Sequence, residues 1–376
     1  MSVCVHNPGG VATTLRLSTS DDTSRLASAE KRQHVRICAE SVSHAAITAP
    51  HGARYGLGRD ALLLAMAPSA DTMSVVAVLN YKGGVGKTTV AANLGAELAF
   101  RGRKVLLIDM DPQASLTLSF YGSDELAKEF TDSGTLLHWF QAFVNDQSAE
   151  LLRDYVVSPP RVNEVLKSHG GQLDLIPSHL GLIDVDLDLA AHVGGSRFQI
   201  SSDGYLWVHR LLADALGDDV FRDYDLIMID CAPNFNMVTR TAIVACDHIL
   251  IPAKADYLST LGIDYLRRKL SELVRDYNGV AGAEAIDPAI LGVVFTMIQF
   301  AGEVPIIAVR NYVTHTEQYD VPVFRQMIRE SKTLFAAAGE RGVPAVLLPH
   351  ANPNVQHELR ELATEFLTRI MIEGAT

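Results

Sequence analysis

A glycine-rich segment with two lysines is the first place in the sequence where residue types and spacing indicate chemistry. Residues 81–89 read Tyr-Lys-Gly-Gly-Val-Gly-Lys-Thr-Thr. Glycine lacks a Cβ, so successive backbone N–H groups can curl around an anion. The residues expected to contact a bound nucleotide are Lys82, Gly83, Gly84, Val85, Gly86, Lys87, Thr88 and Thr89. The segment therefore predicts a phosphate-binding loop.

Two side chains of this loop have separate tasks. Lys87 is placed to reach the β- and γ-phosphates, and the hydroxyl of Thr88 is placed to ligate Mg²⁺. Such a loop requires a strand before it and a helix after it. The apolar run at 75–79 and the helical period over 88–101 supply both elements. These flanks disfavour the alternative of a glycine-rich turn that binds nothing.

Carboxylates follow two further apolar runs. Asp109 and Asp111 end the run at 105–108 in the order Asp-Met-Asp-Pro-Gln, and Asp230 ends the run at 225–229. An aspartate at the end of a buried strand is typical of a residue that holds Mg²⁺ through water. We assign this role to Asp230, whereas an Asp-x-Asp pair by itself more often marks a solvated strand end. Cys231 is interpreted as a small buried apolar residue, because no cysteine is spaced to pair with it.

The elements that must position these residues alternate along the chain. Short apolar runs occur at 75–79, 105–108, 173–176, 225–229, 248–251 and 291–295, and stretches of helical period lie between them, for example at 88–101, 257–275 and 354–371. Such alternation predicts βαβ units, and hence an α/β fold with a doubly wound, mainly parallel sheet and helices on both faces. The ligand site of such a sheet lies at the carboxyl ends of its strands.

The loop departs from the plain phosphate-loop pattern, since Tyr81 stands where glycine is usual and Lys82 follows it. With this second lysine the sequence resembles the deviant Walker A ATPases, the ParA/MinD family. The resemblance implies ATP and Mg²⁺ as cofactors, and ATP hydrolysis that is weak alone and stimulated by a partner. It also implies an ATP-dependent homodimer in which Lys82 reaches the phosphates of the partner subunit. Lys82, Lys87 and Asp111 are then the catalytic residues, with Asp111 positioning the water and Asp109 supporting the metal.

The resemblance covers most of residues 73–376, which we interpret as one ATPase domain. The segments 173–178, 249–253 and 292–297 are similar to family strands in the same order. Three stretches differ: Ala232 replaces a proline, Ala114-Ser115 stands where Gly-Asn is common, and residues 328–331 replace a stretch that helps to form the adenine pocket. No adenine contacts are predicted for this reason.

Within the family, the sequence fits the ParA/Soj branch best, whose members bind DNA nonspecifically and segregate plasmids or chromosomes with a ParB-like centromere-binding partner. Such binding needs contacts to DNA phosphates and no base readout. The candidate basic residues are Arg267, Arg268, Lys269, Arg275 and Arg310, followed by Arg325, Arg329, Lys332 and Arg341. A solvated face balanced by Asp264, Glu272 and Asp276 is an equally acceptable interpretation of the basic helix.

Other functions of the same loop stay open. One is an ATPase that positions a protein cargo, and another is a MinD-like regulator of division at the membrane, neither of which binds DNA. The apolar residues at 359–372 are flanked by balanced charges, which favours a packed terminal helix over a membrane anchor. Cys231 and Cys246 do not match the cluster pattern of iron-protein relatives. A metabolic ATPase that drives amide or ligase chemistry is the least favoured class.

Composition and charge limit which partners and which cellular location are expected. The 376 residues carry a formal charge of −12, so attraction to nucleic acid requires a local basic patch. The four cysteines, without metal-like spacing, and the lack of a long apolar run favour a cytoplasmic protein, which would be nucleoid-associated if it binds DNA. Residues 1–72 read as an extension of low order, either an over-long gene start before Met73 or an arm that binds a partner through Arg25, Lys31, Arg32 and Arg36.

Overall fold

The structure is a computed structural model, and it divides the chain into a unit of residues 1–67 and a unit of residues 68–376. It describes residues 2–6, 12–16, 46–48, 54–56, 73–130, 133–145, 150–192, 202–301 and 304–373. In the first unit, two short antiparallel pairs are described, namely β1 (Ser2–His6) with β2 (Ala12–Arg16) and β3 (Ala46–Thr48) with β4 (Arg54–Gly56). The four basic residues considered for a binding arm lie outside the described residues.

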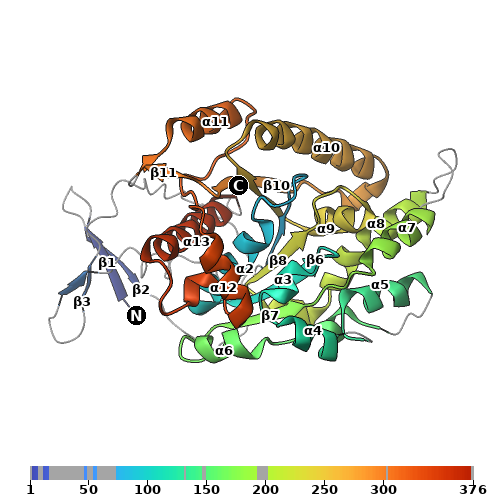
Figure 1. Cartoon of the computed structure of the whole chain (residues 1–376), viewed down its shortest axis with the longest axis horizontal. Coiled ribbons are helices and arrows are strands. Elements are labelled where there is room, and N and C mark those ends of the chain that lie inside the picture. Colours follow the sequence, from blue (N-terminus) through green and yellow to red (C-terminus); the bar gives the residue numbers. More distant parts are fainter. Residues whose placement is uncertain are drawn as a thin grey trace. The chain divides into compact units, whose positions relative to one another are not determined.

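A six-stranded parallel sheet forms the centre of the second unit (Figure 1). The strand order is β10-β9-β5-β8-β6-β7. The strands are β5 (Ser74–Val78), β6 (Lys104–Met110), β7 (Gln172–Ile176), β8 (Leu226–Cys231), β9 (His248–Lys254) and β10 (Ala289–Thr296). Each apolar run expected to be a strand is one, and the predicted doubly wound parallel fold is confirmed. A short pair, β11 (Phe300–Ala301) and β12 (Val304–Pro305), follows β10.

Helices cover both faces of this sheet, because alternate residues of each strand point to opposite sides. On β5, Val75 and Ala77 belong to one apolar core, and Val76 and Val78 belong to the other. The first core is closed by α5 (Leu136–Val144), α7 (Leu182–His192), α8 (Ser202–Leu216), α9 (Met237–Ala245), α10 (Tyr257–Ala281) and α11 (Ile307–Glu317). The second is closed by α2 (Lys87–Phe100), α3 (Ser115–Leu118), α6 (Pro160–Leu166), α12 (Lys332–Arg341) and α13 (Pro353–Glu373), and α4 (Ser123–Glu129) lies between its residues Tyr121 and Phe130.

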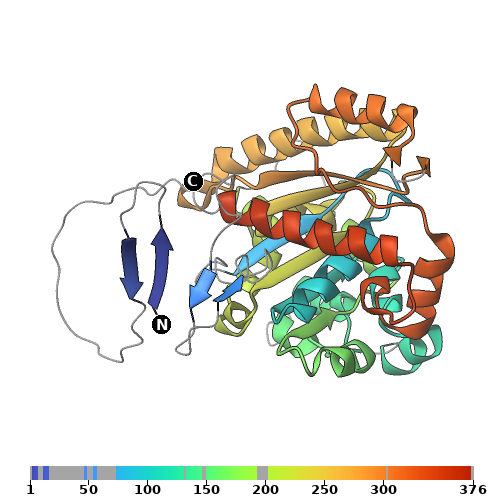
Figure 2. The same ribbon diagram turned by 90° about the vertical axis from the view of Figure 1, so that its left-hand side faces the viewer.

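The last described helix, α13, crosses the second face of the sheet (Figure 2). It buries Leu359, Leu362 and Phe366 in the core, as expected of a packed terminal helix. Arg369 donates hydrogen bonds from its guanidinium to the carbonyls of Leu291 and Val323, both at 2.7 Å. Within the described part of the chain, no helix combines the length and the apolar character needed to cross a membrane.

The turn that follows β6 contains an alanine in a conformation that favours glycine. Ala114 has φ 52° and ψ 31°, and it forms the N-cap of α3. A left-handed residue with a Cβ meets steric repulsion of roughly 1–2 kcal/mol that glycine avoids. The family preference for glycine at this position, from which the sequence departs, therefore has a direct steric reason.

We expect Ala114→Gly to leave the free energy of unfolding unchanged or to raise it by up to about 0.5 kcal/mol, since relief of the left-handed strain offsets the added freedom of the unfolded chain. Ala190→Gly, at an exposed position inside α7, serves as the control and should lower it by about 1 kcal/mol. Denaturant unfolding of both variants measures the difference. A loss at position 114 as large as the loss at position 190 would contradict the steric explanation.

Candidate functional site

The predicted phosphate loop lies between β5 and α2, at the carboxyl edge of the sheet. Gly84 has φ 66° and Gly86 has φ 85°, conformations that a side chain would disfavour. Gly86 is also the N-cap of α2, and no side chain caps this helix. The first N–H groups of α2 are therefore available to an anion, and the helix dipole favours negative charge there.

Hydrogen bonds to the neighbouring strands β9 and β10 fix the position of this loop. The hydroxyl of Thr296, at the end of β10, donates to the carbonyl of Val85 at 2.6 Å. The amide of Asn80 donates to the carbonyl of Pro252 in β9 at 2.7 Å and accepts from the N–H of Lys82 at 3.0 Å. Neither Thr296 nor Asn80 was among the predicted site residues, although each is a polar residue next to an apolar run that ends at the same edge.

Lys87 is a buried cation, with only 6% of its surface exposed. Burial lowers the pKa of Lys87, and the nearby carboxylates of Asp230 and Asp111 oppose this shift. A buried ammonium is stabilised by an anion brought next to it. Lys87 at the first turn of α2 therefore supplies the positive charge that a phosphate group at this helix end requires.

Two aspartates lie side by side at the same edge. Asp109 on β6 and Asp230 on β8 are register partners of adjacent strands, and both are fully buried. Burial raises the pKa of each carboxyl group, and the charge of Asp109 adds to the shift of Asp230. Two like charges in one dry site are unfavourable without a cation. A cation beside the loop would therefore stabilise the two buried carboxylates.

Thr88 and Asp230 fit a magnesium site. The hydroxyl of Thr88 donates to one oxygen of Asp230 at 2.7 Å. The other oxygen, Oδ1, is buried and accepts no hydrogen bond from any described residue. A water molecule bound to Mg²⁺ would satisfy such an acceptor, and hydroxyl and carboxylate oxygens are hard ligands of the kind Mg²⁺ prefers. The donor set therefore matches the predicted metal.

Asp109 has a different environment. Its Oδ2 accepts from the N–H and the hydroxyl of Thr117, at 2.8 and 2.7 Å, and its Oδ1 accepts from the N–H of Asp111 at 3.2 Å. Asp109 therefore shapes the turn that carries Asp111, and its support of the metal stays a prediction. Thr117 was missed, because nothing in a single sequence indicates that a threonine eight residues away bonds to the strand end.

Asp111 lies at the rim of the site and is partly exposed. Its carboxylate accepts from the N–H of Gln113 at 3.0 Å, and its carbonyl accepts from the hydroxyl of Ser178 at 2.7 Å. The backbone is thus fixed by the segment that follows β7, while the carboxylate is partly exposed and close enough to Lys87 to act on its charge. This position is compatible with the predicted contact to a water molecule.

Lys82 contacts the start of α10. Its ammonium pairs with Asp256, with a shortest distance of 2.7 Å, and donates to the hydroxyl of Ser259 at 3.3 Å. Asp256 also caps α10 by accepting from the N–H of Ser259 at 2.8 Å. Burial alone would raise the pKa of Asp256, but the hydrogen bonds from Lys82 and Ser259 lower it.

Asp256 was not among the predicted site residues. A sequence signal was present, because an aspartate immediately before a stretch of helical period, here 257–275, is typical of a helix N-cap. The pairing with Lys82, however, joins residues 174 positions apart. Only the fold brings them together.

The candidate DNA-binding residues on α10 are paired with carboxylates of the same helix. Asp264 accepts from Arg267 at 3.3 Å and from Arg268 at 2.6 Å. Glu272 pairs with Lys269 at 2.6 Å, and Asp276 pairs with Arg275 at 3.0 Å. These are the three carboxylates expected to balance the helix. Arg268 and Arg275 remain well exposed, at 68% and 72% of their side chains.

The other basic candidates are scattered. Arg329 pairs with Glu358 at 2.6 Å and is partly buried, and Lys332 pairs with Glu330 at 3.1 Å. Arg310 is exposed on α11, which packs beside α10 (Figure 1). No ion pair of Arg310 occurs within the described part of the chain. Residues 328–331 run beside the end of β10, where the carbonyl of Ile328 accepts from Ile298 at 3.0 Å.

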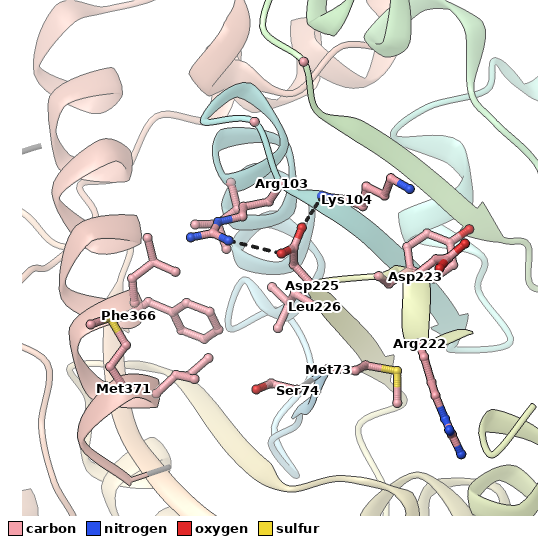
Figure 3. A pocket seen from close by; sticks show the side chains of 16 residues that line it. Met73, Ser74, Arg103, Lys104, Arg222, Asp223, Asp225, Leu226, Phe366 and Met371 are labelled. Atoms are coloured by element: carbon pink, nitrogen blue, oxygen red, sulfur yellow. Dashed lines mark hydrogen bonds and ion pairs between the residues drawn. The ribbon is translucent and has the colours of Figure 1, made fainter. Parts of the chain in front are cut away.

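A separate cavity of about 380 Å³ lies at the opposite, amino-terminal edge of the sheet (Figure 3). Its lining combines apolar residues of α13, such as Phe366, with charged groups. Arg103 donates to Asp225 there at 3.1 Å, and Asp225 also accepts from the N–H of Lys104 at 2.8 Å. No predicted site residue lines this cavity. This cavity is therefore separate from the candidate nucleotide site at the carboxyl edge of the sheet.

Sequence comparison places the chain among proteins of one family. Residues 73–280 match the AAA domain family AAA_31. The chromosome partitioning protein ParA of Caulobacter vibrioides is 30% identical over 233 residues, which are 61% of this chain and 71% of that protein. A putative replication protein A of Rhizobium rhizogenes is 31% identical over 214 residues, 57% of this chain. The chain spans only about half of that relative's length, 48%.

Comparison with solved structures supports the same fold. Apo McdA of Cyanothece superposes with a TM-score of 0.59 at 24% identity, covering 79% of this chain and all of that one. Cobyrinic acid a,c-diamide synthase of Mycobacterium smegmatis, solved with an ATP analogue and magnesium, gives a TM-score of 0.55 at 23% identity. The alignment covers 78% of this chain and 93% of the synthase.

We expect Thr117→Val to lower the free energy of unfolding by about 1–3 kcal/mol, because Asp109 loses a buried donor and the N–H of Ser178 loses its acceptor, the Thr117 hydroxyl, at 3.0 Å. A carboxyl whose pKa is raised by folding costs stability as the pH rises. Losing the hydroxyl raises the pKa of Asp109 further, so the deficit should be larger at about pH 8.5 than at about pH 5.5.

Denaturant unfolding at the two pH values, without nucleotide or metal, measures both effects. Thr368→Val is the matched control, because the Thr368 hydroxyl is exposed and bonds only to the carbonyl of Thr364 in its own helix. The control should change stability by less than about 0.5 kcal/mol at either pH. A deficit of Thr117→Val that is independent of pH would show that Asp109 does not sense this hydroxyl.

Proposed function

The chain belongs to the AAA domain family AAA_31 and is ParA/MinD-like, and from this premise we propose that it is a partitioning ATPase. It binds ATP and Mg²⁺ at the carboxyl edge of the sheet, dimerises around the bound nucleotide and binds DNA nonspecifically in the cytoplasm. A ParB-like partner stimulates hydrolysis. One observation carries the proposal: the loop holds two lysines with different surroundings, Lys87 buried at the start of α2 and Lys82 at the surface with Asp256.

The buried part of the site binds the triphosphate. The N–H groups of the loop and the ammonium of Lys87 contact the β- and γ-phosphates, whose negative charge stabilises the buried ammonium. Thr88 and Asp230 would hold Mg²⁺, which would neutralise negative charge on the triphosphate. Asp111, fixed through its backbone by Ser178, orients the water that attacks the γ-phosphate.

The exposed lysine, Lys82, makes dimerisation depend on the bound nucleotide. In the free chain, the ammonium of Lys82 is occupied by Asp256. In the dimer it leaves this partner and contacts the phosphates of the other copy, whose charge exceeds that of one carboxylate. Because this contact exists only while the triphosphate is bound, ATP stabilises the dimer and hydrolysis releases it.

DNA binding would use the outer face of α10 together with Arg310. Ion pairs between neighbours on one exposed helix are worth only about 0.3–0.5 kcal/mol, so DNA phosphates can compete with their carboxylates. The formal charge of −12 opposes binding by the rest of the chain. Affinity therefore has to come from this local surface and should decline steeply with salt.

The two lysines should separate binding from association. We expect Lys87→Ala to abolish binding of a fluorescent ATP analogue, since the buried cation that faces the phosphates is lost. Lys82→Ala should keep nucleotide affinity within about threefold of wild type, because Lys82 contacts Asp256 in the free chain. It should form no dimer with ATP and Mg²⁺ by light scattering. Equal dimerisation of Lys82→Ala and wild type would remove the trans role of Lys82.

The proposed DNA role is tested by binding of a mixed-sequence duplex with ATP and Mg²⁺, with ADP, and without nucleotide, over a salt series. We expect binding only with ATP, with an affinity that falls linearly in log–log form as salt rises. Arg268→Ala/Arg275→Ala should weaken binding and reduce the slope, because each lost phosphate contact removes about 0.9 from it.

Arg222→Ala is the matched control, since Arg222 is equally exposed and also pairs with a nearby carboxylate, that of Asp219 at 3.3 Å, but lies at the opposite edge of the sheet. It should leave the slope unchanged. An absence of DNA binding with every nucleotide would refute the partitioning role. It would favour an ATPase that positions a protein cargo or acts at a membrane.

A further inference from the structure

The first turns of α10 present an apolar strip to solvent. Tyr257, Leu258, Leu261 and Tyr265 are exposed by 60%, 66%, 43% and 49%. Their spacing places them on one side of the helix. We call these four residues the α10 ridge. The opposite side of the helix, with Ile263 and Leu266, is buried in the core. The ridge is therefore additional to the apolar face that α10 needs for folding.

The α10 ridge is continuous with the phosphate loop. The ring of Tyr265 packs edge-on against Tyr81, with centroids 4.8 Å apart, and Tyr81 stacks on Phe235 at 5.8 Å. The ridge begins directly after Asp256, which holds the ammonium of Lys82. Both residues at the start of the loop, Tyr81 and Lys82, thus contact α10. The ridge therefore adjoins, through Tyr81, the part of the loop that carries Lys82.

The charge distribution on α10 favours a second copy as the occupant. Between Tyr257 and Ile263 the helix carries no charged residue, whereas its later turns carry Arg268, Glu272 and Arg275. Two copies of a chain with formal charge −12 repel each other unless the surfaces that meet are neutral or complementary. The neutral ridge is a place where two copies can approach closely and bury apolar surface.

We propose that the α10 ridge is buried against a second copy of this chain when both copies hold ATP. The inference rests on the proposed ATP-dependent dimer and assigns to it a contact besides Lys82. A two-fold dimer presents the same patch from both copies, so the ridge of each copy is buried by its partner. The dimer interface then contains both changes, the release of Lys82 from Asp256 and the burial of the ridge, and both lie beside the N-terminus of α10.

The test compares two matched double variants with wild type. Leu258→Ser/Leu261→Ser removes apolar surface from the ridge, and Leu180→Ser/Leu187→Ser removes it from α7 and the turn before it, where the exposed fractions are 60% and 68%. Light scattering with a non-hydrolysable ATP analogue and Mg²⁺ gives the dimer dissociation constant. Titration of dilute protein with a fluorescent ATP analogue gives the affinity for nucleotide.

The ridge variant should bind nucleotide as wild type does and weaken the dimer by about tenfold or more. The α7 variant should match wild type in both measurements. A ridge variant that dimerises as wild type does would overturn the inference and leave the proposed function intact. A wild-type chain that stays monomeric with the analogue would overturn the dimer itself, and the inference with it.

Binding to vesicles of anionic and neutral lipid is the second measurement. The inference predicts that wild type and the ridge variant bind such vesicles equally. A ridge variant that loses vesicle binding while its dimer is unchanged would assign the ridge to a membrane surface and overturn the assignment to a second copy.

Discussion

The site depends on an imbalance of charge at the carboxyl edge of the parallel sheet. Asp109 and Asp230 are register partners on adjacent strands and are fully buried, and Lys87 is the one cation of the phosphate loop that lies buried beside them. Burial penalises all three charges. A triphosphate with Mg²⁺ offers both an anion for Lys87 and a cation for the carboxylates. The strand order that brings β5, β6 and β8 together is what makes the site incomplete without a ligand.

The two lysines of the loop show how position determines role. Lys87 opens α2 and is buried, whereas Lys82 lies five residues earlier, on the part of the loop that borders α10. The ion pair of Lys82 with Asp256 is about one-third exposed, so its net stabilisation is small. A weak partner in the free chain is what a lysine needs if it is to exchange that partner for a phosphate group.

Much of this arrangement could be predicted from the sequence, because it depends on local patterns. The strands follow from apolar runs, and the loop follows from glycines between a strand and a helix. The contacts that hold the loop could not be predicted. Thr296 contacts Val85 across 211 positions, and Asp256 contacts Lys82 across 174. Such pairs depend on strand order, which a single sequence does not specify. The left-handed Ala114 could not be predicted either, since alanine rarely adopts that conformation.

The length of α10 lets one helix serve both proposed contacts. Its 25 residues begin beside Asp256, the partner of Lys82, and Arg275 lies 10 residues after Tyr265, the last residue of the ridge, about 15 Å further along the axis. Phosphates at Arg275 would therefore not compete with a second copy on the α10 ridge. A two-fold dimer would carry the basic ends of two α10 helices. A single copy with formal charge −12 offers few phosphate contacts. Doubling them raises affinity far more than twofold, since the second set engages at high effective concentration. Coupling of DNA binding to ATP would then follow from dimerisation alone, without any change in the basic surface.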